Sequence, residues 1–161
     1  MAAKKLFSLV FVRRDNQILL GKKKRGFGQG KWNGFGGKVE PNETPLVGGI
    51  RELREECGLI GTDLRTIGLL HFEFEGEPTL MEVHVFETFT FAGELTESDE
   101  MRPQWYDVKN IPYDKMWLDD IHWYPYMLRS ELFKGYFLYR GTDFIVKYKI
   151  DKIEGNELKG A

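Results

Sequence analysis

The stretch G-K-V-E-P-N-E-T-P-L-V-G-G-I-R-E-L-R-E-E-C-G-L, residues 37–59, decides the fold because it predicts a turn that leads into one short helix. Thr44 is a suitable N-cap, since its hydroxyl can accept a hydrogen bond from a free backbone N–H of the first turn. Pro45 suits the first helical position, where its missing N–H is not needed. Gly58 can adopt the left-handed conformation that ends a helix. We therefore predict a helix from Thr44 to Cys57.

This helix has two chemically different faces. At about 100° per residue its apolar side chains share one sector of the helical wheel, which we expect to face a core. These apolar residues are Leu46, Ile50, Leu53 and Cys57. Glu52, Glu55 and Glu56 fall together on the far side. The helix is therefore expected to carry three carboxylates on one exposed patch.

The acidic patch has two interpretations. Like charges three or four residues apart repel, and Arg51 relieves part of this repulsion through an i,i+4 pair with Glu55, so an ordinary solvated helix face is one of them. The other is a divalent-cation site, because Mg²⁺ prefers oxygen ligands and commonly bridges carboxylates to substrate phosphates. The helix taken alone leaves both interpretations open.

The whole stretch resembles the Nudix box, G-x5-E-x7-R-E-U-x-E-E-x-G-U, where U is a bulky aliphatic residue. The match holds at every constrained position, which are Gly37, Glu43, Arg51, Glu52, Leu53, Glu55, Glu56, Gly58 and Leu59. The resemblance implies a hydrolase that cleaves a nucleoside diphosphate linked to another moiety. It also implies an α/β/α sandwich in which the box forms a loop–helix–loop, and a requirement for Mg²⁺ or Mn²⁺.

The resemblance assigns roles to individual residues of the box. Glu52, Glu55 and Glu56 would be metal ligands, one of them helping to activate water. Arg51 would hold the glutamates in place, and Glu43 would support the loop or a ligand. The chain departs from many family members at Pro41-Asn42, which touches no ligand position.

Gly48-Gly49 is the second departure, and it lies inside the predicted helix. A glycine in a helix interior is less favourable than alanine by about 1 kcal/mol. This pair therefore questions the stability of the helix rather than its chemistry.

Length and composition limit the remaining possibilities. A chain of 161 residues suits a single domain spanning residues 1–161, and its net charge of −2 provides no field that would attract a nucleic acid polymer or an anionic membrane. No apolar run approaches the roughly 20 residues of a membrane span. The single cysteine, Cys57, fits a reducing compartment and a small apolar side chain. We expect a cytoplasmic monomer, with a mitochondrial matrix or nuclear fraction left open.

The rest of the chain alternates strands with one further helix. Strands are predicted at 6–12, 18–20, 63–70, 71–74, 79–91, 101–108, 136–139 and 144–150, with a helix at 116–128. The first strand is expected to lie centrally in the sheet. These elements predict an α+β fold, an α/β/α sandwich whose mixed central sheet is flanked by the box helix and the C-terminal helix. The polar tail, residues 151–161, is predicted to fray.

A basic run and a glycine-rich segment precede the box. Residues 22–25 are Lys-Lys-Lys-Arg, and residues 26–37 contain glycine at six positions. Cations and closely approaching backbone N–H groups suit a polyphosphate. A solvated strand end and an ordinary turn would explain the same residues, so this segment becomes informative only beside the acidic helix.

Further segments resemble one Nudix subfamily, the MutT-homologue oxidised purine nucleoside triphosphatases of animals. The matching segments are residues 23–39, 72–86, 97–105, 114–120 and 132–137. This resemblance implies Mg²⁺-dependent hydrolysis of 8-oxo-dGTP and 2-oxo-dATP to the monophosphate and pyrophosphate, which protects nucleotide pools. Methylated purine triphosphates are a further candidate class.

The narrower resemblance also implies a substrate site. The base would be held by Asn33, Trp117, Asp119 and Asp120, and Leu118 would be a further substrate-binding residue. The pocket walls would be Phe27, Phe72, Met81 and Met101. The phosphate path would be lined by Lys23, Phe35, Gly36, Gly37 and Lys38. The Gly36 carbonyl and Glu100 would join the box glutamates around metal. Ser8 stands where relatives often have Thr, which keeps the hydroxyl and removes a methyl group.

Asp119 and Asp120 have a physical interpretation of their own. Two carboxylates in an aromatic pocket do not both ionise easily, so one pKa should be raised. A protonated Asp donates a hydrogen bond, whereas an ionised one only accepts. Moving one proton between them would let a single pocket accept both oxidised guanine and oxidised adenine. The alternative is that the pair only stabilises a helix N-terminus.

Three other functions compete with this prediction. The first keeps Nudix chemistry with another substrate, such as ADP-ribose or a dinucleoside polyphosphate. The second is a Nudix-fold module that binds nucleotides or RNA without hydrolysis, against which the intact Arg51, Glu52, Glu55 and Glu56 argue. The third is a structural domain with a solvated acidic helix. Mg²⁺-dependent pyrophosphate release would exclude the last two.

Overall fold

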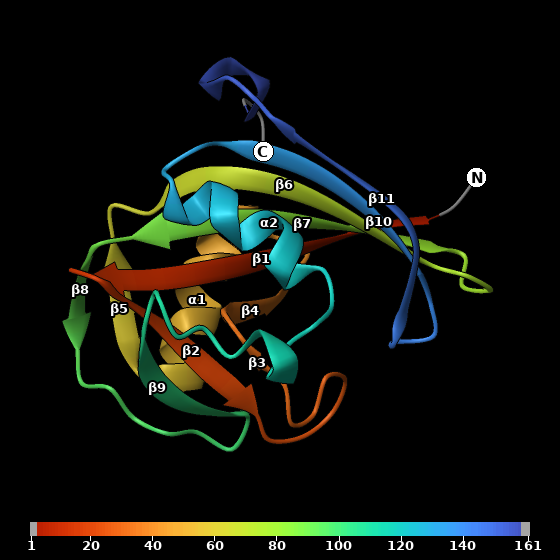
Figure 1. The fold of residues 1–161 in the computed structure, drawn as a ribbon. Helices are drawn as coiled ribbons and strands as arrows, with labels where there is room; N and C mark the ends of the chain where they lie inside the picture. The colour runs from red at the N-terminus through yellow and green to blue at the C-terminus, as the bar shows by residue number, and fades with distance from the viewer. Residues whose placement is uncertain (1–2, 159–161) are drawn as a thin grey trace.

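β1 (Ala3–Arg14) runs through the middle of a curled mixed sheet in the computed structural model, which describes residues 3–158 (Figure 1). The strand order is β11-β10-β6-β7-β1-β2-β3, with β4 also pairing with β1 and β9 with β2. The other strands are β2 (Gln17–Lys23), β3 (Trp32–Asn33), β4 (Phe35–Lys38), β6 (Arg65–Phe74), β7 (Thr79–Thr88), β9 (Met101–Asp107), β10 (Phe133–Arg140) and β11 (Phe144–Lys152). The predicted central position of the first strand is confirmed.

The sheet is mixed because two of its pairings are parallel. β1 runs parallel to β7 and β10 runs parallel to β6, while the remaining pairs are antiparallel. Within residues 3–158, a second sheet is formed by β5 (Leu59–Thr62) and β8 (Thr90–Gly93). The parallel pairings bring distant segments together, since they place β7 directly beside β1 and β10 directly beside β6.

The two helices cover opposite faces of the large sheet (Figure 1). Side chains alternate along β1: Val10 and Val12 pack in a buried cluster with residues of α1 (Pro45–Cys57), whereas Phe11 packs with residues of α2 (Asp120–Leu128). This arrangement confirms the predicted α+β sandwich. No helix in residues 3–158 is both long and apolar enough to cross a membrane.

The box helix begins and ends as predicted. The Thr44 hydroxyl accepts a hydrogen bond of 3.2 Å from the Val47 N–H, and Gly58 adopts the left-handed conformation with φ 79°. The expected core position of Leu46 is wrong, since this side chain is 40% exposed. The buried face instead includes Gly49, where a Cβ would lie 2.9 Å from Val10 Cγ2. Glycine therefore lets α1 approach β1 closely.

Three of the predicted strands have different bounds in the structure. The pair predicted at 63–70 and 71–74 forms one continuous strand, β6, with an irregularity near Thr66. The strand predicted at 79–91 ends at Thr88, whose hydroxyl donates to the Thr62 carbonyl. The chain then turns into β8, which pairs with β5 instead of the large sheet.

The second helix begins later than predicted. Tyr113–Lys115 forms a 3₁₀ turn, Met116 is extended with φ −131° and ψ 172°, and α2 begins only at Asp120. Met116 is buried in the core on this side of the sheet. The extended Met116 separates the turn from the helix, so Trp117 lies in a connecting segment rather than on a helix.

The tail predicted to fray contains regular structure. β11 continues to Lys152, and a 3₁₀ turn covers Gly155–Leu158. Ile153 and Leu158 are both buried. Residues 159–161 of the predicted tail lie outside the described residues.

Candidate active site

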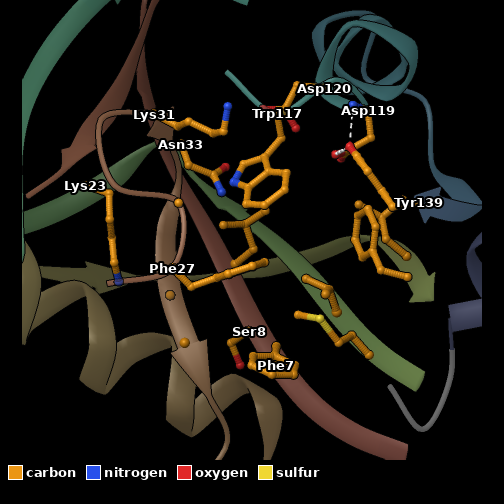
Figure 2. Close-up of a pocket in the computed structure, with 18 of the residues that line it drawn as sticks. Phe7, Ser8, Lys23, Phe27, Lys31, Asn33, Trp117, Asp119, Asp120 and Tyr139 are labelled. Carbon is orange, nitrogen blue, oxygen red and sulfur yellow. Dashed lines mark hydrogen bonds between the residues drawn. The ribbon is translucent and has the colours of Figure 1, made fainter. Parts of the chain in front are cut away.

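A cavity of about 310 Å³ opens between the sheet and the loops that join β2 to β3 and β9 to α2 (Figure 2). Twelve residues predicted for the substrate site line it, namely Ser8, Lys23, Phe27, Asn33, Gly36, Gly37, Phe72, Met81, Met101, Trp117, Asp119 and Asp120. These residues come from segments separated by more than a hundred positions in the chain, and the parallel pairing of β1 with β7 helps to bring them together.

Asp119 is held by hydrogen bonds at one end of this cavity. The Trp123 indole N–H donates to Asp119 Oδ2 at 2.8 Å, and the Tyr139 hydroxyl donates to Asp119 Oδ1 at 2.5 Å. The Asp119 backbone N–H donates in turn to the Tyr139 oxygen at 3.1 Å. Burial raises the pKa of Asp119, and the bonds from Tyr139 and Trp123 oppose that rise. Both carboxylate oxygens of Asp119 therefore already accept a hydrogen bond.

Asp120 is buried with much poorer hydrogen bonding. Its Oδ2 atom is inaccessible to solvent and has no hydrogen-bond partner within the described part of the protein. Burial, followed by the charge of Asp119, raises the pKa of Asp120 well above its ordinary value. A buried polar atom without a partner is unfavourable, so a group bound in the cavity can supply what Asp120 lacks.

Aromatic side chains form the walls of the cavity. Phe27 and Trp117 lie with their ring centroids 5.0 Å apart, and Phe27 meets Phe74 edge to face at 6.0 Å. Phe27 itself is 63% exposed. Gly26 and Gly28 flank it with φ 80° and 85°, a conformation that other residues rarely adopt. The two glycines thus present Phe27 at the mouth of the cavity.

Lys31 and Asn33 add polar groups to the lining of the cavity beside Trp117 (Figure 2). Asn33 Oδ1 accepts the Gly34 N–H at 2.8 Å. The Lys31 ammonium lies 5.4 Å from the Trp117 ring centroid. The positive charge of Lys31 acts to lower the pKa of Asp120, against the larger effects of burial and Asp119. The cavity therefore combines apolar walls with a few placed donors and acceptors, as small-molecule sites do.

Glu52, Glu55 and Glu56 form an acidic edge of α1, and Arg51 organises it. Its Nε and Nη2 atoms donate to the Glu43 carboxylate at 2.9 and 2.6 Å, and Nη1 donates to Glu52 and Glu55. The hydrogen bond from Arg51 lowers the pKa of Glu43 to about 2. Burial raises the pKa of Glu52 despite the same arginine. One guanidinium therefore sets the positions of three carboxylates.

Glu56 is not part of an exposed patch, which corrects the prediction for this residue. It is only 5% exposed, whereas the side chain of Glu55 is 58% exposed. The Gly36 N–H donates to Glu56 Oε1 at 2.9 Å. Burial, and then the charge of Glu52, raises the pKa of Glu56 to about 8. The acidic edge thus runs from an exposed carboxylate to a buried one beside the cavity.

Glu100 approaches this edge from the loop before β9. The Arg25 guanidinium donates to Glu100 Oε1 at 2.8 Å and lowers the pKa of Glu100. The Lys23 ammonium lies 3.8 Å from Glu100 Oε2 and also lines the cavity. Glu100 therefore stands at the rim of the cavity, paired with cations of the protein itself.

The acidic residues have the chemistry of a divalent-cation site, although they do not yet converge. Across residues 3–158, no three His, Cys, Asp or Glu side chains already form a metal-binding cluster. Arg51 holds Glu52, and Arg25 holds Glu100. The charges of Glu52 and Glu100 both raise the pKa of Glu56, so this edge carries excess negative charge. Carboxylate oxygens are the ligands that Mg²⁺ prefers, and the residues present therefore fit such an ion.

The structure places four predicted site residues differently. Phe35 is fully buried in the cluster between α1 and the sheet, away from the cavity. Lys38 and Leu118 are exposed and do not line the cavity. Ser8 lines it, but its hydroxyl donates to the Pro45 carbonyl at the start of α1. The Ser8 hydroxyl therefore ties β1 to the helix instead of facing a base freely.

The sequence did not reveal nine further lining residues, which are Phe7, Leu9, Gly28, Lys31, Leu70, Phe74, Val83, Trp123 and Tyr139. Alternation along β1 could have indicated Phe7 and Leu9, because residues two apart share one face of a strand. Tyr139 carried no such signal. It reaches the cavity only because β10 pairs in parallel with β6, and Tyr139 lies opposite Phe74 in that register.

Comparisons with known proteins agree on the family. Residues 5–127 match the model of the NUDIX domain. The chain is 53% identical to the oxidized purine nucleoside triphosphate hydrolase of Danio rerio and 45% identical to that of Mus musculus, in each case over 96% of this chain and 99% of the relative. The crystal structure of the mutator MutT protein from Bacillus halodurans has the same fold, with a TM-score of 0.82 and 24% identity over 91% of this chain and 97% of that one.

Proposed function

The chain belongs to the Nudix family, and we propose on that basis that it is a pyrophosphohydrolase of oxidised purine nucleoside triphosphates. It converts 8-oxo-dGTP and 2-oxo-dATP to the monophosphate and pyrophosphate, which removes mutagenic precursors from the nucleotide pool. The two vertebrate relatives that carry this activity in their names match 96% of this chain, a span far longer than the box alone.

One observation supports this function most strongly. The cavity that ends at Asp119 and Asp120 is also lined by Gly36 and Gly37, and these glycines touch the acidic edge of α1. A Cβ at Gly37 would overlap Glu52, so the backbone lies directly against that carboxylate. A purine in the cavity would therefore have its phosphates beside the glutamates.

The base would be held by stacking and by its polar edge. Phe27 and Trp117 provide aromatic surfaces against which a flat heterocycle can stack. Asp120 Oδ2 is buried without a partner in the described chain and would hydrogen-bond to the polar edge of the base. Oxidation at position 8 of a purine adds a carbonyl at C8 and an N–H at N7, whereas oxidation at position 2 adds a carbonyl at C2 and an N–H at N1, so each lesion changes the hydrogen-bonding pattern at a different edge of the base. Recognition by hydrogen bonds can then separate oxidised from ordinary purines strongly.

The phosphates would lie toward Lys23 and the glycine-rich loop. Lys23 lines the cavity and can stabilise phosphate oxygens as a point charge. Gly36 and Gly37 leave room for close approach because they carry no side chain. Glu56 sits beside them with a raised pKa, and so it can hold a proton or accept one from an attacking water near neutral pH.

The cation that we propose for the acidic edge is Mg²⁺, with Mn²⁺ as a substitute. Glu52, Glu55, Glu56 and Glu100, together with the Gly36 carbonyl, would hold it. When bound, the ion would neutralise charge on the leaving pyrophosphate and lower the pKa of an attacking water. Nudix enzymes generally use divalent ions, and the oxygen ligands on this edge fit that class.

Turnover measurements on a panel of nucleotides test the proposal. The panel holds 8-oxo-dGTP, 2-oxo-dATP, a methylated purine triphosphate, dGTP, CTP and ADP-ribose, each with Mg²⁺ and with EDTA. We expect monophosphate and pyrophosphate from the oxidised purines, at a kcat/KM at least about tenfold above that for dGTP, and none with EDTA. Preference for CTP or ADP-ribose would assign another Nudix substrate, and binding without turnover would make the protein a nucleotide-binding module.

A further inference from the structure

Arg25 forms an exposed ion pair with Glu100 at the rim of the cavity. The Arg25 Nη2 atom lies 2.7 Å from Glu100 Oε1, and Arg25 Nε donates to the same oxygen at 2.8 Å. The Arg25 side chain is 65% exposed and that of Glu100 is 41% exposed. Within residues 3–158, Glu100 is the only ion-pair partner of Arg25. Because exposed ion pairs are weak, this one can exchange its partners readily.

Arg51 holds the acidic edge of α1 much more firmly than Arg25 holds Glu100. The Arg51 side chain is only 23% exposed, and it donates to Glu43, Glu52 and Glu55. Release of Arg51 would break hydrogen bonds to all three acids at once, whereas release of Arg25 breaks contacts with one carboxylate. Arg25 is therefore the arginine that can leave its acid at low cost.

The loop that carries Arg25 does not depend on this ion pair. The Lys24 backbone N–H donates to the Glu100 carbonyl at 2.8 Å, and the Lys24 ammonium donates to the Ser98 carbonyl at 2.9 Å and to Glu97 at 2.7 Å. These contacts keep the segment beside Glu100 after the guanidinium has left the carboxylate. A change of partner therefore needs only a rotation of the Arg25 side chain.

Arg25 also lies close to the proposed path of the phosphates. Lys23 and Phe27, two residues before and two residues after it, both line the cavity (Figure 2). The Lys23 ammonium lies 3.8 Å from Glu100 Oε2, and the charges of Lys23 and Glu100 both act on the pKa of Glu56. The rim that carries Arg25 thus adjoins the buried end of the acidic edge. A guanidinium can donate two parallel hydrogen bonds to a phosphate group, as it can to a carboxylate.

We propose that Arg25 is an exchangeable counterion of Glu100 and a phosphate-binding residue. Without a divalent cation, Arg25 pairs with Glu100. When Glu100 binds a cation instead, the freed guanidinium donates to the phosphates of the nucleotide. This inference rests on the proposed function, because it assigns Arg25 a role toward the triphosphate. The same side chain should then oppose metal binding and favour phosphate binding, whereas a residue that only stabilises the loop would not act in opposite directions.

The test compares Arg25→Gln with Lys24→Gln, which removes the same charge from the neighbouring residue and leaves the pair with Glu100 in place. The first readout is the affinity of the nucleotide-free protein for Mn²⁺, measured by calorimetry at about 0.15 M salt, where distant exposed charges are screened. We expect the Kd for Mn²⁺ to fall about threefold in Arg25→Gln, because the competitor for Glu100 is gone, and to stay within about 1.5-fold in Lys24→Gln.

A second background shows whether Glu100 carries this effect. In Glu100→Gln the carboxylate for which Arg25 competes is absent, so adding Arg25→Gln should leave the Kd for Mn²⁺ within about 1.5-fold. A threefold fall that persists in this background would overturn the exchange. So would a fall of equal size in Lys24→Gln, or Mn²⁺ binding that is unchanged or weaker in Arg25→Gln. Thermal midpoints confirm that each variant is folded.

The second readout is phosphate binding, with inorganic pyrophosphate as the probe at saturating Mn²⁺. We expect Arg25→Gln to weaken pyrophosphate binding about tenfold and to raise the KM for 8-oxo-dGTP by a similar factor, with Lys24→Gln within about twofold of wild type. Unchanged pyrophosphate affinity in Arg25→Gln would overturn the phosphate-binding role. Failure of the wild-type protein to hydrolyse either oxidised triphosphate would instead refute the proposed function, and the Mn²⁺ and pyrophosphate measurements would still decide the role of Arg25.

Discussion

The Gly36 N–H donates a hydrogen bond of 2.9 Å to Glu56 Oε1. This bond joins the glycine-rich loop, which lines the cavity, to the buried end of the acidic edge of α1. The carboxylate that is expected to act on the substrate phosphates is therefore positioned by the same backbone that would approach them. The bond also depends on the close packing of β4 against β1, in which Gly36 lies opposite Leu9.

Glu56→Gln tests the chemical part of this arrangement. Glutamine keeps an oxygen that can accept the Gly36 N–H but removes the charge, so we expect kcat to fall at least about 100-fold. The thermal midpoint should stay within about 4 °C of the wild type, since no contact of the fold is lost. Glu94→Gln, an exposed residue, is the matched control. Near wild-type turnover in Glu56→Gln would reject the role of this residue.

Arg51→Lys tests whether the guanidinium positions the acidic edge. Lysine keeps the charge but cannot donate to Glu43, Glu52 and Glu55 at once, because it lacks the planar array of donors. We expect kcat to fall about tenfold or more and the concentration of Mg²⁺ for half-maximal activity to rise. Arg54→Lys on the same helix is the control. If both variants have the same activity, Arg51 has no special positioning role.

Asp119→Asn and Asp120→Asn should affect the two oxidised bases differently. An amide at 120 donates permanently, as a protonated Asp120 would, whereas an amide at 119 must place a donor beside Trp123 or Tyr139. We expect the ratio of kcat/KM for 2-oxo-dATP to that for 8-oxo-dGTP to differ by at least about fivefold between the two variants. Parallel losses for both substrates would contradict the distinct protonation of the two acids.

Asp120 should also make the stability of the protein depend on pH. Its pKa is raised in the folded state, so the folded protein keeps a proton that the unfolded chain releases above its ordinary pKa of 3.8. By linkage, the free energy of unfolding falls as pH rises from about 4 toward the raised pKa. Asp120→Asn removes this loss. Relative to wild type, it should therefore gain stability between about pH 4 and pH 8 in urea denaturation.

A control for this pH effect is Asp143→Asn, which lies in the exposed turn between β10 and β11. Its stability relative to wild type should be independent of pH. If the difference between Asp120→Asn and wild type is also the same at about pH 4 and pH 8, Asp120 is not a protonated buried acid in the folded protein.

The parts of the fold that local sequence determines were predictable. Thr44, Pro45 and Gly58 act through capping and backbone conformation within a few residues, and the helix has the predicted ends. The break between β7 and β8 was not predictable in this way, because it depends on Thr88 bonding to Thr62 across the second sheet. The buried position of Glu56 likewise depends on the Gly36 backbone and not on the helical wheel.

The candidate site was predictable where a motif names its residues and less so elsewhere. Asp119 and Asp120 belong to a recognisable segment, and both line the cavity. Tyr139 belongs to no such segment, and its contact with Asp119 arises from the parallel pairing of β10 with β6. Phe35 was assigned to the phosphate path from its place in a motif, yet its side chain alternates to the other face of β4 and fills the core.

The crystal structure of the complex with Mg²⁺ and an 8-oxo-dGTP analogue that cannot be cleaved between the α- and β-phosphates tests the central claim most directly. We predict that the oxidised base lies between Phe27 and Asp120, with the phosphates and metal ions against Glu52 and Glu56. Phosphates bound elsewhere, with no metal at this edge of α1, would contradict the account.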